Sequence, residues 1–419
     1  MRPLTMAGIN LFLPVHLSAY VRARLYSRWV LRQRQGGKVF GRSSRSDVSP
    51  FIVMDVMRAA NERAAQGGDV IHLEVGQPSG QAPAGVLAAA TAALDSDPIG
   101  YTEALGLPRL RERIADHYRH AHGVAVDTAR IAITTGSSAG FLLSFLAAFD
   151  AGDRVAVAAP GYPAYRNILT ALGIECVLVP VGPESRWQLS VAALAKVEGR
   201  LDGVVVASPS NPTGSMLSAI EVAELAAWCE VQGIRLISDE IYHGIVYGAA
   251  AGSAIGAGPH AVIVNSFSKY YAMTGWRLGW MVLPEDLVRP VECLQQNLFI
   301  SAPTLSQIAA CAVFDCTDEL DARVAAYRNN RDILLNELPS AGFTRLAPSD
   351  GAFYLYADIA DLTNDSADFC RRMLAETGVA ATPGIDFDPL AGAHTMRFSF
   401  AGPASDMELA VKRLKAWRK

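Results

Sequence analysis

The segment AVIVNSFSKYYAMTGWRLGW, residues 261–280, decides the fold because an apolar run passes directly into a polar segment that contains a lysine. The run Val262-Ile263-Val264 lacks polar alternation, which is typical of a strand buried on both faces of a sheet. Lys269 follows where this strand would end. A lysine enclosed in a cleft loses its proton more easily and becomes a nucleophile toward carbonyl groups. Arg277 offers a rigid fork of donors that suits a phosphate.

The same order of apolar run, polar or glycine-rich turn and helical pattern repeats from about Ile131 onward. This repetition predicts an α/β fold, in which helices cover both faces of a mostly parallel sheet to give three layers. Residues 318–338 form one long charged amphipathic pattern, and shorter strand-like and helical segments follow. Such separate elements predict a smaller α+β domain. The apolar runs of the predicted large sheet are Ile131-Ala132-Ile133, Val155-Ala156-Val157, Val204-Val205-Val206, Leu236-Ile237 and Val262-Ile263-Val264.

Each predicted strand ends in residues with chemistry suited to a ligand, and open α/β sheets bind ligands beyond the carboxyl ends of their strands. Small residues after Ile133 open a helix and predict a phosphate site at its N-terminus. Together with the amine of Lys269 and the guanidinium of Arg277, they indicate a ligand with both an aldehyde and a phosphate, which is pyridoxal phosphate. The strand-end residues are Gly136, Ser137, Ser138, Tyr162, Asn211, Asp239, Tyr242, Ser266, Ser268 and Lys269.

Three motifs resemble those of the class I/II aminotransferases, which belong to the fold type I pyridoxal-phosphate-dependent enzymes. They are SxSKxxxxxGxRxG at residues 266–279, NPTG at 211–214 and DExY at 239–242. The resemblance covers roughly residue 47 to the C-terminus. It implies that Lys269 forms the Schiff base with the cofactor and then moves the proton between the substrate Cα and the cofactor. It also implies that Asp239 keeps the pyridine nitrogen protonated.

The resemblance implies roles for further residues by their positions. Asn211 and Tyr242 would contact the phenolic oxygen of the cofactor, and Tyr162 would stack on its ring. Arg397 would hold the substrate α-carboxylate, and Gly76 and Asn211 would also contact the substrate. Phosphate contacts would come from Gly136, Ser137, Ser138, Ser266 and Arg277, with Ser268 nearby and Tyr101 reaching across from the other subunit of a homodimer.

Four regions follow from these inferences. Residues 1–46 form a basic extension, and residues 47–80 form the N-terminal part of the small domain. Residues 81–320 form the large domain that binds pyridoxal phosphate, and residues 321–419 complete the small domain. Two peptide bonds, Ala159–Pro160 and Asn211–Pro212, are expected to be cis, as tight turns at strand ends sometimes are.

Several candidate residues also have ordinary structural interpretations. Asp239 suits a helix cap, and so do Ser137 and Ser138. Tyr162 could fill apolar space, and Arg397 could pair with a structural acid. His243 is adjacent to Tyr242 in the sequence, but we expect it to be structural because Lys269 already supplies the base.

Composition argues against several classes of protein. The 419-residue chain has a net charge of −4, but nine basic residues and no acid precede Asp47, so the remainder carries −13. Such an acidic body is unsuited to nucleic acid. No apolar run of membrane-spanning length occurs. The six cysteines form no CxxC pair or zinc motif, so we expect no metal site and a cytoplasmic location.

The basic extension has two interpretations. Leu17, Val21, Leu25 and Trp29 fall four apart among arginines, as on an amphipathic helix that resembles a transit peptide or lies on a membrane surface. The alternative is a disordered extension without a function of its own, because the predicted helix is short and lacks a cap.

We expect an aminotransferase that moves an amino group from an L-amino acid to a 2-oxoacid by ping-pong chemistry. A β-eliminating (C–S) lyase on the same scaffold is the alternative, because fold does not determine reaction type. A pyridoxal-phosphate-responsive regulator is a remote alternative, because the 46-residue extension offers little room for a DNA-binding module.

The expected donor is neutral, with an aliphatic or aromatic side chain, and is favoured over aspartate. Dicarboxylate-specific relatives use an arginine near residues 294–303, where this chain reads LQQNLFISAP and has no cation. Ser138 occupies a position where some bacterial aspartate enzymes have lysine. Both differences predict a weak fit for a second carboxylate.

Overall fold

The structure is a computed structural model that describes residues 43–417. The chain divides into two units, Met1–Asp47 and Val48–Lys419, and the architecture below is that of the second. A short 3-10 helix, η1 (Ser44–Ser46), belongs to the first unit. The amphipathic pattern predicted between Leu17 and Trp29 lies outside the described residues. None of the helices in the described part of the chain has the length and apolar character that a membrane crossing requires.

A seven-stranded sheet lies at the centre of Val48–Lys419, with the strand order β2-β8-β7-β6-β5-β3-β4. Four neighbouring pairs are parallel, and only β8 pairs antiparallel, with β2 on one side and β7 on the other. The predicted α/β fold with a mostly parallel sheet is therefore confirmed. The strands are β2 (Ile131–Thr134), β3 (Arg154–Ala159), β4 (Glu175–Pro180), β5 (Gly203–Ala207), β6 (Arg235–Asp239), β7 (Val262–Ser266) and β8 (Gly279–Val282).

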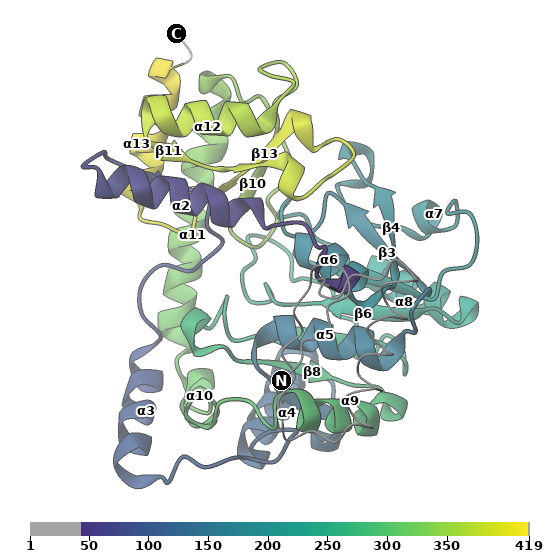
Figure 1. Cartoon of the computed structure of the whole chain (residues 1–419). Helices are drawn as coiled ribbons and strands as arrows, with labels where there is room; N and C mark the ends of the chain where they lie inside the picture. The colour runs from purple at the N-terminus through teal and green to yellow at the C-terminus, as the bar shows by residue number, and fades with distance from the viewer. Residues whose placement is uncertain (1–42, 418–419) are drawn as a thin grey trace, which may run out of the picture. The chain divides into compact units, whose positions relative to one another are not determined.

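The central strands send alternate side chains into two apolar cores. In β5, Val204 and Val206 pack in one core and Val205 packs in the other. Both faces of the sheet are thus buried, which explains why these strands read as unbroken apolar runs. Helices cover each face (Figure 1). On the first face lie α3 (Ala84–Ser96), α4 (Pro108–His122), α8 (Ala219–Gln232) and α10 (Thr304–Ala310), and on the second lie α5 (Gly136–Ala148), α6 (Pro163–Leu172) and α9 (Glu285–Leu298).

Two strands of this sheet were not predicted from the sequence. β4 is an edge strand whose side chains are mostly half-buried or exposed, although its run Cys176-Val177-Leu178-Val179 is apolar, so a sequence signal was present and was missed. β8 has four residues and starts at Gly279, inside the motif that follows Lys269, so its apolar run from Trp280 was not recognised as a separate strand.

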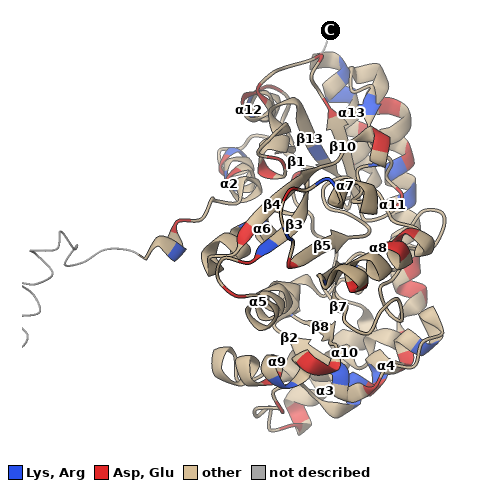
Figure 2. Ribbon diagram, turned by 90° about the vertical axis from the view of Figure 1, so that its right-hand side faces the viewer, with Lys and Arg blue, Asp and Glu red and all other residues tan. Residues whose placement is uncertain are grey.

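A second group of elements surrounds a four-stranded antiparallel sheet with the order β12-β13-β10-β9. Its core contains Phe353, Phe369 and Phe398. The outer helices α11 and α13 carry both acidic and basic side chains, while the central strands carry few (Figure 2). The elements are α2 (Ile52–Ala65), β9 (Arg345–Leu346), β10 (Tyr354–Asp358), α11 (Thr317–Glu337), α12 (Ser366–Thr377), β12 (Thr382–Pro383), β13 (Thr395–Ser399) and α13 (Ala404–Trp417), with the parallel pair β1 (Ile71–His72) and β11 (Val379–Ala380).

Turns at the ends of β3 and β5 contain the two predicted cis peptide bonds. Ala159–Pro160 and Asn211–Pro212 are both cis, so this prediction is confirmed. A third cis bond, Ser208–Pro209, lies in the same loop as Asn211 and was not predicted.

Candidate active site

A cavity of about 240 Å³ lies beyond the carboxyl ends of β5, β6 and β7. Its lining brings together predicted site residues from seven separate segments of the chain. They are Gly76, Ser137, Ser138, Tyr162, Asn211, Asp239, Tyr242, Ser268, Lys269, Arg277 and Arg397. Since the strands are parallel, their carboxyl ends meet at one edge, which is why residues so distant in sequence converge.

Lys269 projects its amine into the cavity from the loop after β7. Its Nζ donates a hydrogen bond to the Gly76 carbonyl at 2.6 Å and lies 5.7 Å from the ring centre of Tyr242 and 5.9 Å from that of Phe353. Burial, followed by the positive charges of Arg397 and Arg277, lowers the pKa of Lys269 to about 8. The amine is therefore much more readily deprotonated than an exposed lysine, as a nucleophile requires.

Asp239 ends β6 and is 3% exposed. Its Oδ1 accepts from the Ile241 N–H at 3.1 Å, and its Oδ2 accepts from the Tyr165 hydroxyl. Burial raises the pKa of Asp239 to about 7 despite these donors. Among the described residues it forms no ion pair with a lysine or arginine, so its charged form calls for a cationic partner within the cavity. The structural alternative, a helix cap, is not present, because a turn and not a helix follows β6, and the contact with Ile241 lies within that turn.

The first turn of α5 and Arg277 form an anion-binding corner. Thr135 precedes the helix without making a side-chain cap, so the first-turn N–H groups are not satisfied by it. Gly136 has φ of 75°, and a Cβ there would lie 2.6 Å from a terminal nitrogen of Arg277. Glycine is thus required for the guanidinium to approach the helix start. Backbone donors, the positive helix end and a cation together suit a phosphate. Ser137 and Ser138 lie in this first turn, and Thr135 holds the cap position.

Arg397, on β13, is 3% exposed and has no carboxylate partner among the described residues. Its terminal nitrogens donate to Asn211 Oδ1 at 2.7 Å and to the Glu74 carbonyl at 2.6 Å, while its Nε has no partner. The guanidinium carbon lies 4.3 Å from the ring centre of Tyr354 and 4.6 Å from that of Phe387. The structural alternative, a pair with a protein acid, is not present, and a buried cation of this kind fits an anionic substrate.

Three predicted residues do not line the cavity. Gly136 is the first residue of α5 and precedes Ser137, which does line the cavity. Ser266 is buried at the end of β7, where its hydroxyl accepts from the Ser268 N–H at 3.0 Å. Tyr101 is 83% exposed in the loop between α3 and α4 and lies outside the cavity of its own chain. His243 does not line it either; its Nε2 lies 3.1 Å from the Ser208 carbonyl.

The sequence missed several residues that the structure brings to the cavity. Tyr165 stands one helical turn after Tyr162, and that spacing was the available signal. Tyr354 shares a 2.7 Å hydrogen bond with the Tyr242 hydroxyl, and a Cβ at Gly76 would clash with it, which explains the glycine there. The others had no signal that distinguishes them from core residues; among them are Phe51, Val53, Met54 and Met57 near the start of α2, with Asp386 and Phe387.

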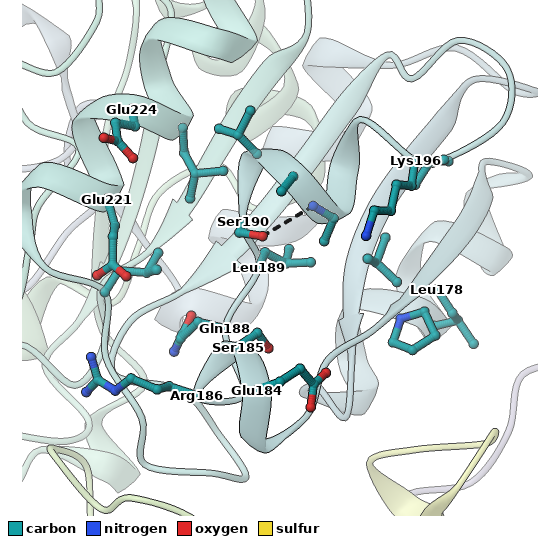
Figure 3. Close-up of a pocket in the computed structure, with 18 residues that line it drawn as sticks. Leu178, Glu184, Ser185, Arg186, Gln188, Leu189, Ser190, Lys196, Glu221 and Glu224 are labelled. Atoms are coloured by element: carbon teal, nitrogen blue, oxygen red, sulfur yellow. Dashed lines mark hydrogen bonds between the residues drawn. The ribbon is translucent and has the colours of Figure 1, made fainter.

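A larger cavity of about 650 Å³ lies between the 180–197 segment and α8, and it contains none of these residues (Figure 3). Several of its polar groups have structural partners: the Ser190 hydroxyl caps α7 (Val191–Leu194), and Glu221 forms a capping box with Ser218. Arg186 pairs with Asp350 at 2.6 Å. We therefore assign the chemistry to the smaller cavity.

Comparison with known proteins agrees with this geometry. The family described as aminotransferase class I and II matches residues 68–414. The chain belongs to this family. The aminotransferase is 54% identical to a valine–pyruvate aminotransferase of Mycobacterium tuberculosis over 377 residues, or 89% of this chain and 97% of the relative. It is 33% identical to a (5-formylfuran-3-yl)methyl phosphate transaminase of Methanocaldococcus jannaschii over 87% and 96% of the two chains.

Solved structures show the same fold. A crystal structure of an aminotransferase from Mycobacterium tuberculosis superposes with a TM-score of 0.89 at 53% identity, covering 90% of this chain and 99% of that one. The predicted family and the predicted amino-acid to 2-oxoacid transamination are thus confirmed. Enzymes of this family generally depend on pyridoxal phosphate.

The cavity's donor set fits this cofactor. Asp239 is a buried carboxylate that lacks a cationic partner, and a protonated pyridine nitrogen would supply one. The α5 start with Arg277 suits a dianionic phosphate, and Lys269 presents a readily deprotonated amine for an aldehyde. Aldehyde, phosphate and ring nitrogen thus each have a matching group.

Proposed function

We propose that this aminotransferase uses pyridoxal phosphate to move the amino group of a neutral, aliphatic or aromatic L-amino acid to a 2-oxoacid. The observation that carries the proposal is that one cavity holds an enclosed amine, Lys269, a buried carboxylate, Asp239, and the guanidinium of Arg397, which has no carboxylate partner among the described residues. When bound, pyridoxal phosphate withdraws electrons from the substrate Cα and carries the amino group between the two half-reactions.

We assign the binding roles as follows. The α5 start with Ser137, Ser138 and Arg277 holds the phosphate, supported by Gly136, Ser266 and Ser268. Asp239, fixed by the Tyr165 hydroxyl and the Ile241 N–H, holds a proton on the pyridine nitrogen. Asn211 and Tyr242 contact the phenolic oxygen, and Tyr162 covers the ring face. These assignments are supported by the positions of the side chains in and directly behind the cavity.

The chain's own groups then orient the substrate and move its proton. Arg397 binds the α-carboxylate in a bidentate manner, with Asn211 Oδ1 fixing one of its terminal nitrogens at 2.7 Å. Gly76 lies beside the substrate through its backbone carbonyl, which already accepts from Lys269 Nζ at 2.6 Å. Lys269 Nζ takes the Cα proton and returns it, a task suited to a pKa of about 8.

The preference for an apolar donor is supported by the cavity lining. Among the described residues that line it, the cations are Lys269, Arg277 and Arg397, and each already has a role. None remains for a second carboxylate, whereas Val53, Met54 and Met57 offer apolar surface. The similarity to a valine–pyruvate aminotransferase supports the same choice.

A donor panel tests the proposal directly. We expect valine, leucine or phenylalanine to exceed aspartate in kcat/KM by about tenfold or more with pyruvate or 2-oxoglutarate as acceptor, since an unpaired buried carboxylate costs more than 1.4 kcal/mol. A clear aspartate advantage would contradict the proposed specificity. Release of pyruvate and ammonia from a β-substituted donor without any 2-oxoacid would instead support the lyase alternative.

We further propose that the enzyme is a homodimer in which Tyr101 reaches the phosphate of the other subunit. The support is that Tyr101 is 83% exposed and lies outside its own cavity. A monomer that turns over at the full rate would contradict this role. The division into a basic extension (1–46), a large domain (81–320) and a small domain (47–80 with 321–419) remains part of the proposal, as does a cytoplasmic location.

A further inference from the structure

Helix α2 obtains its N-terminal cap from a distant part of the chain. Its N-cap residue is Phe51, which makes no side-chain cap. Asp386, in the 3-10 helix η7 (Gly384–Asp386), fills this role: its Oδ1 accepts from the Ile52 N–H at 3.0 Å and its Oδ2 from the Val53 N–H at 3.2 Å. Asp386 is 2% exposed. First-turn N–H groups need an acceptor, and a carboxylate is a favourable one.

The segment that leads into α2 is also held by α6. The Ser49 carbonyl accepts from Asn167 Nδ2, on α6, at 3.1 Å. The ring centre of Phe51 lies 5.7 Å from that of Tyr162. Figure 1 shows the start of α2 directed toward α6. The first turn of α2 is therefore fixed between η7 and α6.

The first two turns of α2, with Phe51 before them, supply an apolar wall of the candidate active site. Phe51, Val53, Met54 and Met57 all line the cavity, and we call these four residues the α2 wall. Phe387, next to the capping Asp386, lies 4.6 Å from the guanidinium carbon of Arg397. A substrate held at Arg397 therefore lies close to η7 and to the α2 wall.

We propose that Asp386 is a positioning residue for donor selection, because its carboxylate fixes the α2 wall against the side chain of the amino acid. The inference rests on the proposed function with an apolar donor. Asp386 also lines the cavity, but each of its carboxylate oxygens accepts from a backbone N–H of α2, so we assign its role to the placement of that helix. An amino acid with a methyl side chain depends less on the wall than one with a branched or aromatic side chain.

The test compares two capping aspartates in the cofactor-loaded enzyme. Asp386→Ala and Asp386→Asn remove or weaken the cap of α2. Asp365→Ala is the matched control, because Asp365 caps α12 by accepting from the Asp368 N–H at 3.0 Å and does not line the cavity. KM and kcat are measured for valine, phenylalanine and alanine, and the equilibrium binding of 3-methylbutanoate and acetate is measured as a non-reacting readout.

We expect Asp386→Ala to raise KM for valine relative to alanine about fivefold, the effect of one lost cap, with kcat nearly unchanged. Binding of 3-methylbutanoate should weaken by a similar factor while that of acetate does not. Asp386→Asn should give a smaller shift in the same direction, because its amide retains one acceptor and turns a donor toward the other N–H. Asp365→Ala should leave the valine-to-alanine ratio unchanged.

Equal losses for valine and alanine in both Asp386 variants would overturn the proposal, as would the same ratio change in Asp365→Ala. If Asp386→Ala does not fold, the ratio measured for Asp386→Asn decides. A wild-type enzyme that prefers aspartate to valine would overturn the proposed donor class instead, so the two failures are distinguishable.

Discussion

The two sides of the active-site cavity are built in different ways. On the strand side, which comprises the ends of β5, β6 and β7 with the start of α5, each functional group follows directly after a buried strand in the sequence. On the helix side, which comprises the α2 wall and η7, segments more than 300 residues apart meet through the contacts of Asp386. The strand side holds buried charges with shifted pKa values, while the helix side is mostly apolar.

This difference separates chemistry from specificity. The strand side presents the amine, carboxylate and anion-binding corner that pyridoxal chemistry needs, whichever amino acid reacts. The helix side presents the surface that a donor side chain meets. Changes on the strand side should therefore affect all donors alike, and changes on the helix side should affect some donors more than others.

The largest effect should come from Lys269→Ala, on the strand side. Loss of both the nucleophile and the proton carrier should reduce transamination by about a thousandfold or more for every donor. Single-turnover absorbance with valine and alanine measures it. Lys196→Ala, in the larger cavity of Figure 3, is the matched control and should retain full activity. A Lys269→Ala enzyme within tenfold of wild type would remove the chemical role assigned to the strand side.

Arg397→Ala should have the next largest effect, because Arg397 stands where the two sides meet. Loss of a buried partner of a substrate carboxylate costs about 2–5 kcal/mol, or tens to thousands in kcat/KM. The loss should be similar for valine, alanine and phenylalanine, since all share the α-carboxylate. Arg186→Ala, in the larger cavity of Figure 3, is the control. A loss of kcat/KM confined to one donor would show that Arg397 contacts the donor's side chain and not the shared α-carboxylate.

The buried charges of the strand side should give opposite pH dependences of stability in the protein without cofactor. The pKa of Lys269 is lowered from 10.5 to about 8, so folding is penalised below pH 8 and the penalty disappears as pH rises toward 10.5. The pKa of Asp239 is raised from 3.8 to about 7, so its penalty grows from pH 3.8 to 7 and is complete above that.

Replacing either charged side chain by an uncharged one should remove its cost to folding stability. Lys269→Met should raise the melting temperature at pH 7 by about 2 °C or more, with the gain shrinking above pH 8. Asp239→Asn should give its gain above pH 7 and lose it toward pH 4. Thermal unfolding across pH 4–10 measures both. Gains that do not vary with pH would contradict the assigned pKa shifts.

The smallest effect should come from the α2 wall. Met57→Ala removes apolar contact from the cavity and should lower kcat/KM for valine about tenfold relative to alanine, as the loss of a few methylene contacts does. Leu409→Ala, a partly exposed leucine on α13, provides the control. Equal kcat/KM losses for both donors would mean that the helix side does not select them.

The same contrast explains how much could be predicted from the sequence. Each buried strand and the functional residues that follow it are neighbours in the sequence, as the SxSK and DExY motifs show. The α/β fold, the cluster around Lys269 and Asp239 and two cis peptide bonds could therefore be predicted. Tyr165 was missed although it stands one helical turn from Tyr162. The α2 wall and Asp386 could not be predicted, because their pairing depends on how β12 and α2 pack and leaves no local pattern.

Reductive trapping tests the central claim most directly. Pyridoxal phosphate is added to the purified protein, borohydride follows, and peptide mass spectrometry locates the attached pyridoxyl group. The account predicts a single modification, on Lys269, that requires the cofactor's phosphate and is lost in Lys269→Ala. A protein that stays colourless with added cofactor, or a label spread over surface lysines with Lys269 unmodified, would contradict it.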